Sequence, residues 1–272
     1  MLMKHEDALM KTDVYYFSGT GNSLWVAQKI SEKIEDSELI SIPKAVNTKE
    51  GIKGEIIGIV CPIYMYNIPL IVADFIRKIE SAEYIFLVYA GAGELGGGIK
   101  DLFKVFASKK LKVSSIFNVP MPSNYTPYGI TPEDRQKKLF ANIDSRVDGI
   151  VKIVKKRESF ITSSTTSFFK THIHPGILYR MGYSRINRLD MSFTTDEKCN
   201  GCSICQKVCP VNNIVMKDNK PEWKNQCQQC YACLQWCPTE SIQAGKRTVG
   251  IKRYHNPHIK VKDIISSSGG KA

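Results

Sequence analysis

Apolar and polar positions between residues 13 and 160 follow two alternating patterns. Short apolar runs cover residues 13–17, 39–42, 56–61, 84–89 and 111–119. Several of these runs lack strict in–out alternation, which is typical of strands buried on both faces of a parallel sheet. Segments with helical periodicity lie between or after them, at 22–34, 69–79, 97–108 and 131–157. The alternation predicts an α/β fold with a doubly wound, five-stranded parallel sheet.

The loop after the first predicted strand has the composition of a phosphate site. It reads Phe-Ser-Gly-Thr-Gly-Asn-Ser-Leu over residues 17–24. Glycines permit close backbone approach, and hydroxyls and N–H groups at the start of a helix bind phosphate. Leu24 replaces the third glycine of a dinucleotide fingerprint, and no lysine follows as in a nucleoside-triphosphate loop. We therefore expect a phosphate monoester here; the alternative is a simple glycine turn.

Three further loops follow predicted strands. Residues 61–69 include Tyr64 and Tyr66, residues 89–94 are mostly small, and residues 121–128 include Tyr125 and Tyr128. Ligands of such sheets bind at the carboxyl ends of the strands. Together with the phosphate loop, these loops predict a site for a planar ring with a phosphate tail, although each tyrosine alone could simply cover the edge of the sheet.

The segment Ser18-Gly19-Thr20-Gly21-Asn22-Ser23 resembles the phosphate loop of flavodoxins. The resemblance covers about residues 13–157 and implies FMN as the cofactor, with its phosphate on Ser18, Thr20, Gly21, Asn22 and Ser23. It also implies that the second and third loops flank the isoalloxazine ring. The residues concerned are Pro62, Tyr64, Met65, Tyr66, Asn67, Ala90, Gly91, Ala92 and Gly93.

Eight of the nine cysteines form two identical runs. Cys199-x2-Cys202-x2-Cys205-x3-Cys209-Pro210 recurs 28 residues later as Cys227-x2-Cys230-x2-Cys233-x3-Cys237-Pro238. Three cysteines at intervals of three wrap one iron–sulfur cluster, and the fourth ligates the cluster of the other run. This predicts one cluster on Cys199, Cys202, Cys205 and Cys237, and a second on Cys227, Cys230, Cys233 and Cys209.

The two runs resemble the two-[4Fe–4S] arrangement of bacterial-type ferredoxins, over about residues 193–245. Structural zinc is the alternative, but it would not require the third cysteine, the x3 step or the prolines. The ninth cysteine, Cys61, ends a predicted strand and is expected in the core.

Length and composition agree with two modest domains. The chain has 272 residues, 43% hydrophobic and 24% charged, which excludes global disorder. We divide it into an N-terminal extension (1–12), the FMN-binding domain (13–159), a linker (160–192), the ferredoxin domain (193–245) and a basic tail (246–272). His172 and His174 suggest a metal site, but no acidic or cysteine partner has suitable spacing. We therefore expect both histidines to be ordinary linker residues.

Targeting signals are not visible. The N-terminus has no apolar core of signal-peptide length, and the longest near-continuous apolar stretch, residues 56–66, is far below the ~20 residues of a spanning helix. We expect a cytoplasmic protein without membrane insertion.

Positive charge is concentrated at the end of the chain. Of the net charge of +12, the last 27 residues supply +6, from seven Lys and Arg and one Asp. This segment ends in Ser-Ser-Ser-Gly-Gly-Lys-Ala, and we expect it to be mobile. It would suit docking to an acidic redox partner, since opposite charge speeds encounter; a purely solubilising tail is the alternative. Nucleic acid is not expected, because aromatics are few and no binding motif is present.

The order of the parts resembles flavodoxin–ferredoxin fusion proteins. That resemblance implies an intracellular electron-transfer protein that passes electrons between a redox partner, two [4Fe–4S] clusters and FMN. No constellation of general base and nucleophile is present, so no catalytic residue is predicted. One alternative is a flavin-dependent reductase of a quinone or nitro compound, with Tyr64, Tyr66 and Tyr125 lining its substrate cavity. The other is a flavin-free interaction domain fused to a ferredoxin.

Overall fold

The computed structural model describes residues 10–92, 98–162 and 186–269. Its N-terminal half is built on a six-stranded sheet in the order β2-β1-β3-β4-β5-β6, with all neighbours parallel. This is the doubly wound order that has its topological switch between β1 and β3. The strands are β1 (Thr12–Tyr16), β2 (Ser37–Ser41), β3 (Ile52–Cys61), β4 (Ile79–Gly91), β5 (Ser115–Pro120) and β6 (Phe160–Ile161).

The five predicted strands are all present, and β6 is an addition. It is two residues long and pairs Phe160 with Ser115 and Ile161 with Ile116. Its two residues are apolar but exposed, and a run of two is too short to be recognised as a strand from the sequence. The central strands β3 and β4 are continuously buried over Ile56–Cys61 and Tyr84–Ala90, as expected for a sheet covered on both faces.

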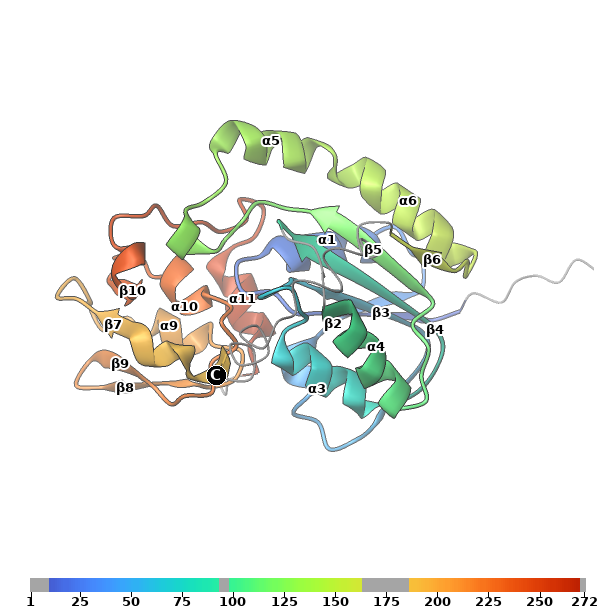
Figure 1. Ribbon diagram of the computed structural model, residues 1–272, viewed down its shortest axis with the longest axis horizontal. Helices are drawn as coiled ribbons and strands as arrows, with labels where there is room; N and C mark the ends of the chain where they lie inside the picture. Colours follow the sequence, from blue (N-terminus) through green and yellow to red (C-terminus); the bar gives the residue numbers. More distant parts are fainter. Residues whose placement is uncertain (1–9, 93–97, 163–185, 270–272) are drawn as a thin grey trace, which may run out of the picture.

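Helices cover the two faces of the sheet (Figure 1). One side carries α1 (Asn22–Ser31) and α6 (Ile143–Lys155), which contact each other. The other carries α2 (Ile42–Ala45), α3 (Leu70–Lys78) and α4 (Gly98–Ser108), which form a contiguous row. The apolar faces of these helices and the sheet form the main core.

The single helix predicted over 131–157 is two helices, α5 (Glu133–Ala141) and α6, joined at Asn142. The helix α6 buries five apolar side chains against the sheet, whereas α5 buries none. Figure 1 shows why: α5 extends past the sheet, above the C-terminal half of the molecule. Its Phe140 packs edge-on against Trp25 and His258.

The cysteine-rich half consists of small elements. They are η3 (Ile186–Ser192), β7 (Phe193–Thr195), α9 (Ile204–Lys207), β8 (Ile214–Lys217), β9 (Lys220–Trp223), α10 (Ala232–Gln235) and β10 (Ile242–Ala244). Two antiparallel pairs, β7 with β10 and β8 with β9, enclose a second core that contains Ile214, Leu234 and Ile242.

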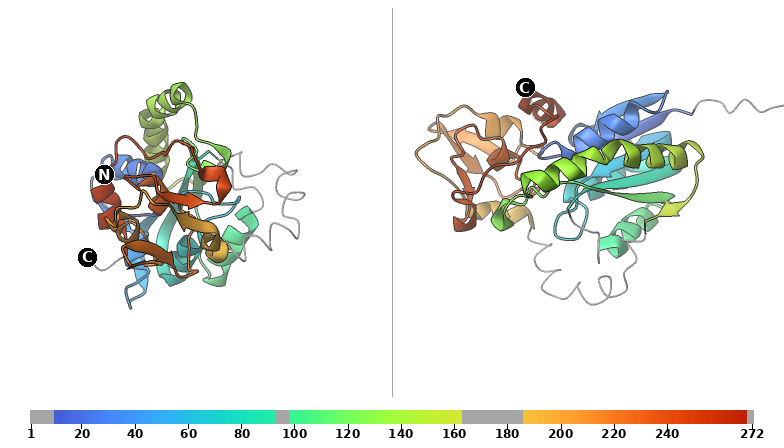
Figure 2. Two further views of the ribbon diagram at one scale, coloured as in Figure 1. Left: turned by 90° about the vertical axis from the view of Figure 1, so that its left-hand side faces the viewer. Right: turned by 90° about the horizontal axis from the view of Figure 1, so that it is seen from above.

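The C-terminal segment is folded, and our expectation of a mobile tail was wrong for residues 246–269. It forms η4 (Lys246–Thr248) and α11 (Val261–Ser267), and α11 lies against α2. Figures 1 and 2 show the segment returning from the cysteine-rich half to the sheet. Ile259 and Ile264 join the main core, and the Ser41 hydroxyl donates a hydrogen bond to the Ser267 carbonyl. These buried contacts hold the segment in spite of its charge.

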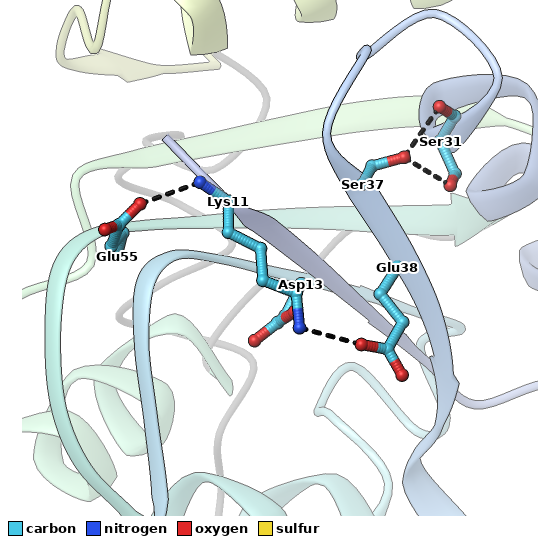
Figure 3. A network of polar contacts seen from close by, with 6 residues as sticks. All are labelled: Lys11, Asp13, Ser31, Ser37, Glu38 and Glu55. Atoms are coloured by element: carbon cyan, nitrogen blue, oxygen red, sulfur yellow. Dashed lines mark hydrogen bonds and ion pairs between the residues drawn. The ribbon is translucent and has the colours of Figure 1, made fainter. Parts of the chain in front are cut away.

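A polar network connects strands at the amino end of the sheet, opposite the loops that follow the carboxyl ends of the strands (Figure 3). The Lys11 amino group reaches Glu38 at 2.8 Å and Asp13 at 3.3 Å, and the Lys11 N–H donates to Glu55 at 2.7 Å. The hydrogen bonds to Glu38 and Asp13 raise the pKa of Lys11 above its ordinary value. The network thus connects β1 to both neighbouring strands.

Among the described residues, no helix is long and apolar enough to cross a membrane.

A pair of glycine substitutions tests the packing of the sheet. Gly58 of β3 lies opposite Phe86 of β4, and an added Cβ would overlap the Phe86 ring. Gly58→Ala should therefore lower the free energy of unfolding by about 1–3 kcal/mol. Gly149→Ala is the control, because Gly149 is exposed on α6 with open space around its Cα and should gain up to about 1 kcal/mol of helix propensity. Thermal denaturation followed by circular dichroism would contradict this packing if both variants melted alike.

Candidate functional site

A large cavity lies at the carboxyl ends of the parallel strands. Its volume is about 1170 Å³, beyond the range of about 300–1,000 Å³ of ordinary small-molecule sites. Residues of both halves line it, from the strand-end loops of the sheet and from the cysteine-rich half. The sheet contributes Ser18, Gly19, Thr20, Asn22, Ser23, Pro62, Ile63, Tyr64, Met65, Tyr66, Ala90, Gly91, Ala92, Pro122, Ser123, Asn124, Tyr125 and Tyr128.

Most of the predicted cofactor-binding residues therefore come together at one cavity. Two of them do not line it: Gly21 faces the C-terminal segment, and Asn67 is buried behind the loop. Gly93 lies outside the described residues.

The phosphate loop has the parts of an anion site. The helix α1 begins without a side-chain cap, which leaves the N–H groups of its first turn for a ligand. The Ser18 hydroxyl accepts a hydrogen bond from the Gly21 N–H at 3.0 Å, and the Thr20 hydroxyl accepts one from Asn124 at 2.8 Å. Because each hydroxyl accepts in these bonds, its own proton can be donated into the cavity.

The side chain of Asn22, a predicted phosphate-binding residue, is engaged by other residues of the chain. Its amide donates to the Pro122 carbonyl at 3.0 Å, and its Oδ1 accepts from the Tyr254 hydroxyl at 2.7 Å and from Asn256 at 3.2 Å. The side chain therefore ties the loop to its surroundings, and only the backbone of Asn22 is left to bind a phosphate.

The loop after β3 is a tight turn. Tyr64 and Asn67 exchange two backbone hydrogen bonds of 2.8 and 3.0 Å, and Met65 and Tyr66 between them both have left-handed backbones, with φ of 47° and 60°. Two non-glycine residues in this conformation strain the backbone, which is a common feature of binding sites. The turn presents Met65 and Tyr66 to solvent at the rim of the cavity.

Tyr64 lies deeper in the same loop. Its ring stands edge-on to Phe17, with 6.4 Å between centroids. Its hydroxyl oxygen is buried and has no hydrogen-bond partner among the described residues. Burial and the nearby Cys230 thiol raise the pKa of Tyr64 well above its ordinary value.

The far wall of the cavity was not predicted. It consists of Ile186 and Leu189 of η3, and of Gln229 and Tyr231 from the second cysteine run. Tyr231 packs edge-on against Tyr125, with 5.4 Å between ring centroids. No local pattern distinguishes these residues, because only the tertiary contact between the halves brings them to the cavity.

The eight clustered cysteines fall into two groups of four. Group one surrounds a small cavity and comprises Cys199, Cys202, Cys205 and Cys237. Group two comprises Cys209, Cys227, Cys230 and Cys233. The pKa of Cys233 is raised first by burial and then by the other three thiols of this group, which therefore lie near it. Each group thus takes its fourth cysteine from the other run. Cys205 of group one also raises the pKa of Cys233, so the two groups are adjacent.

The backbone of the two runs repeats. The residue before the second cysteine is left-handed in both, with φ of 71° at Gly201 and 54° at Gln229. The residue after it is left-handed too, with φ of 61° at Ser203 and 57° at Tyr231. These reversals turn each run around a common centre, and the short helices α9 and α10 follow at equivalent places.

Hydrogen bonds reach several sulfurs. The N–H groups of Asn213 and Gln229 each donate at 3.2 Å, to Cys209 and Cys227 respectively. Burial alone would raise the pKa of Cys237, but hydrogen bonds with Ser241 and Thr239 lower it. Donors to sulfur favour the thiolate, the form that binds metal, and tune the potential of a cluster.

The donor set fits iron–sulfur clusters. Among the described residues, no three His, Cys, Asp or Glu side chains converge closely enough to hold a single metal ion. A zinc site would require such convergence, with all ligands about 2–2.3 Å from one point. In a [4Fe–4S] cluster each thiolate binds a different iron, so four thiols spaced around a common centre are suitable.

The phosphate loop and cysteine group two are in direct contact. A Cβ at Gly19 would overlap the Cys230 carbonyl oxygen, and the Trp236 indole N–H donates to the Gly19 carbonyl at 3.0 Å. Trp236 therefore joins the two halves by a hydrogen bond. Gln235 adds hydrogen bonds of 2.7 and 2.8 Å to Asn124 and Thr126.

Asp190 of η3 forms hydrogen bonds with residues next to cysteine group two. Its carboxylate accepts from Asn213 at 2.6 Å and from the Asn225 N–H at 3.1 Å. The Asn187 carbonyl of the same element accepts from the Cys227 N–H at 2.9 Å. The end of the predicted linker is thus part of the cysteine site. The predicted linker residues His172 and His174 lie outside the described residues.

Comparison with known proteins identifies the cysteine-rich half. Residues 198–242 match a family model described as a 4Fe-4S dicluster domain. A search of curated proteins found no match.

Solved structures similar to the chain include the Trp repressor binding protein from Bacillus subtilis, at 14% identity and a TM-score of 0.32, covering 50% of this chain and 99% of that one. They also include the rubredoxin oxygen:oxidoreductase from Desulfovibrio gigas, at 13% identity and a TM-score of 0.33. The match covers 54% of this chain and 36% of that enzyme. The family match over residues 198–242 supports iron–sulfur cluster binding by the cysteine-rich half and a redox role for the chain.

Proposed function

We propose that the protein is an electron-transfer protein that passes electrons between a redox partner, two [4Fe–4S] clusters and FMN. The contact between Gly19 of the phosphate loop and Cys230 of cysteine group two carries this proposal. FMN, when bound, can exchange one or two electrons, whereas each cluster exchanges one. A chain that joins the two can therefore gather or divide electron pairs.

The cavity supports FMN through its own residues. Ser18, Thr20 and the first turn of α1 offer donors for a phosphate. Tyr64, Tyr66 and the backbone of Ala90–Ala92 offer flat and apolar surface for a ring. The Tyr64 hydroxyl, buried without a described partner, also favours a bound ligand with a polar atom.

The positions of the cysteine groups suggest an order for the relay. Cys202 of group one is exposed and Cys199 is half-buried, whereas all four cysteines of group two are buried. Group two lies against the cavity. We infer that a partner exchanges electrons with the cluster on group one, and that the cluster on group two connects it to the cavity. An acidic partner stays part of the proposal, since opposite charge speeds encounter; one cation of the tail, Lys252, pairs with Glu133 at 2.5 Å.

Iron counts in single and double variants test the ligand sets. The anaerobically purified chain should hold about eight irons, and Cys209→Ser should hold about four. Adding Cys230→Ser should lower the count no further, because both cysteines belong to group two. Adding Cys202→Ser instead should leave almost none. The reverse pattern would show that Cys209 serves its own run, and zinc with little iron would refute the clusters.

A reductive titration tests the combination of cofactors. The purified chain should contain close to one FMN and accept about four electrons, two for the flavin and one for each cluster. The Cys230→Ser variant should accept about three, with the flavin absorption bands retained. A chain without flavin bands that accepts only two electrons would instead support the flavin-free interaction domain.

The size and rim of the cavity favour a second candidate, a reductase of a small aromatic acceptor. The large apolar side chains of Met65, Tyr66, Tyr125, Tyr128 and Leu189 are exposed, and all of them line the cavity. Such a rim suits a flat apolar molecule. A quinone would take two electrons and two protons to become a hydroquinone.

Turnover of a soluble naphthoquinone by the reduced protein tests this candidate. Leu189→Ala should raise KM about threefold to tenfold, because covering this exposed leucine with a bound molecule contributes on the order of 1 kcal/mol to binding. Met191→Ala is the matched control, since Met191 is exposed on the same element but does not line the cavity. Equal effects of the two substitutions, or no turnover, would leave only the electron carrier.

A further inference from the structure

The C-terminal segment covers the outer side of the phosphate loop. Between η4 and α11 it passes from the cysteine-rich half to the sheet (Figures 1 and 2). Tyr254 is 3% exposed and Asn256 is 0% exposed. Burial of two polar side chains at this depth requires partners, and they find them in the loop.

Three hydrogen bonds connect the segment to the loop. The Asn256 N–H donates to the Thr20 carbonyl at 2.8 Å, and the Asn256 amide donates to Asn22 Oδ1 at 3.2 Å. The Tyr254 hydroxyl donates to the same oxygen at 2.7 Å. Since Asn22 is the first residue of α1, these bonds fix the backbone from which the phosphate donors project.

The backbone of Gly21 confirms how close the approach is. Its φ of 96° belongs to the left-handed region, and a Cβ there would lie 2.9 Å from Ile259 and 3.0 Å from the Asn256 side chain. The loop therefore takes its shape in contact with the segment, in addition to its own turn.

We propose that Tyr254 and Asn256 are positioning residues for the phosphate site: they hold Thr20–Asn22 so that the loop and helix N–H groups face the cavity. This inference rests on the proposed binding of FMN. Neither residue lines the cavity, so their effect passes through Asn22 and Thr20. The C-terminal segment is thus a functional part of the N-terminal site.

Stacked rings hold the segment in place on both sides of Asn256. His255 stacks on Trp236 with 4.2 Å between ring centroids, and His258 stacks on Trp25 at the same distance. The Tyr254 N–H donates to Gln235 at 2.7 Å. Asn256→Ala also removes the bond from the His258 N–H to Asn256 Oδ1, at 2.9 Å. The two stacked pairs and the Tyr254 N–H bond involve neither the Tyr254 hydroxyl nor the Asn256 side chain, so the segment should stay seated.

Equilibrium titration of the flavin-depleted, cluster-loaded full chain with FMN tests the proposal. The double variant Tyr254→Phe with Asn256→Ala leaves Asn22 Oδ1 without either donor, and each lost bond is worth about 0.5–1.5 kcal/mol. The dissociation constant of FMN should therefore rise roughly tenfold or more, with smaller rises for each single variant. Asn142→Ala is the matched control, because Asn142 is exposed between α5 and α6, and its side chain bonds the Lys138 carbonyl and no other group among the described residues.

Iron content and the midpoint of thermal denaturation, measured on the same samples, separate positioning from general damage. We expect both to stay close to wild type while FMN affinity falls. Unchanged affinity in the double variant, or a fall that only parallels loss of iron and of folded protein, would overturn the inference. If the wild-type chain itself bound no FMN, the proposed function would fail instead.

Discussion

The structure depends on the close approach of two backbones at Gly19. No side chain can stand there, because the Cys230 carbonyl occupies the position of a Cβ. This approach brings the loop at the start of the chain against the second cysteine run, and the Trp236 bond to the Gly19 carbonyl holds it there. Without this contact the cavity would have only one wall.

The phosphate loop is consequently enclosed on two sides. Cys230 and Trp236 cover one side, and Asn256 and Ile259 cover the other. A loop that would be exposed in an isolated α/β domain is here buried by residues more than 200 positions away. Burial of polar backbone requires partners for each group, and the C-terminal segment provides some of them. The two halves therefore share one structural element.

Features with a local signature were predictable from the sequence. The apolar runs predicted five strands of the sheet, because buried parallel strands need nearly continuous apolar residues. The spacing of the cysteines predicted both groups of four, because each run must turn around a common centre. The glycines and hydroxyls after the first strand also form a local pattern, and the structure places Ser18, Gly19, Thr20 and Ser23 at the cavity.

The remaining features arise from tertiary contact. The C-terminal segment looked mobile because its charges are frequent, yet Tyr254, Asn256, Ile259 and Ile264 are buried among them. The break at Asn142 reflects the end of the sheet beneath the helix, which no helical pattern records. Asn22 belongs to the predicted phosphate loop, but its side chain forms hydrogen bonds with three residues from distant segments.

The return of the C-terminal segment also has a consequence for biosynthesis. N-terminal domains begin to fold while the rest of the chain is still being synthesised. The strands of the sheet lie within residues 12–161, but the contacts of Thr20 and Asn22 with residues 254 and 256 need a segment that is synthesised much later. The loop thus acquires its final shape only after residues 254 and 256 have been synthesised, so a nascent chain that stops before them would contain the sheet without the finished cavity.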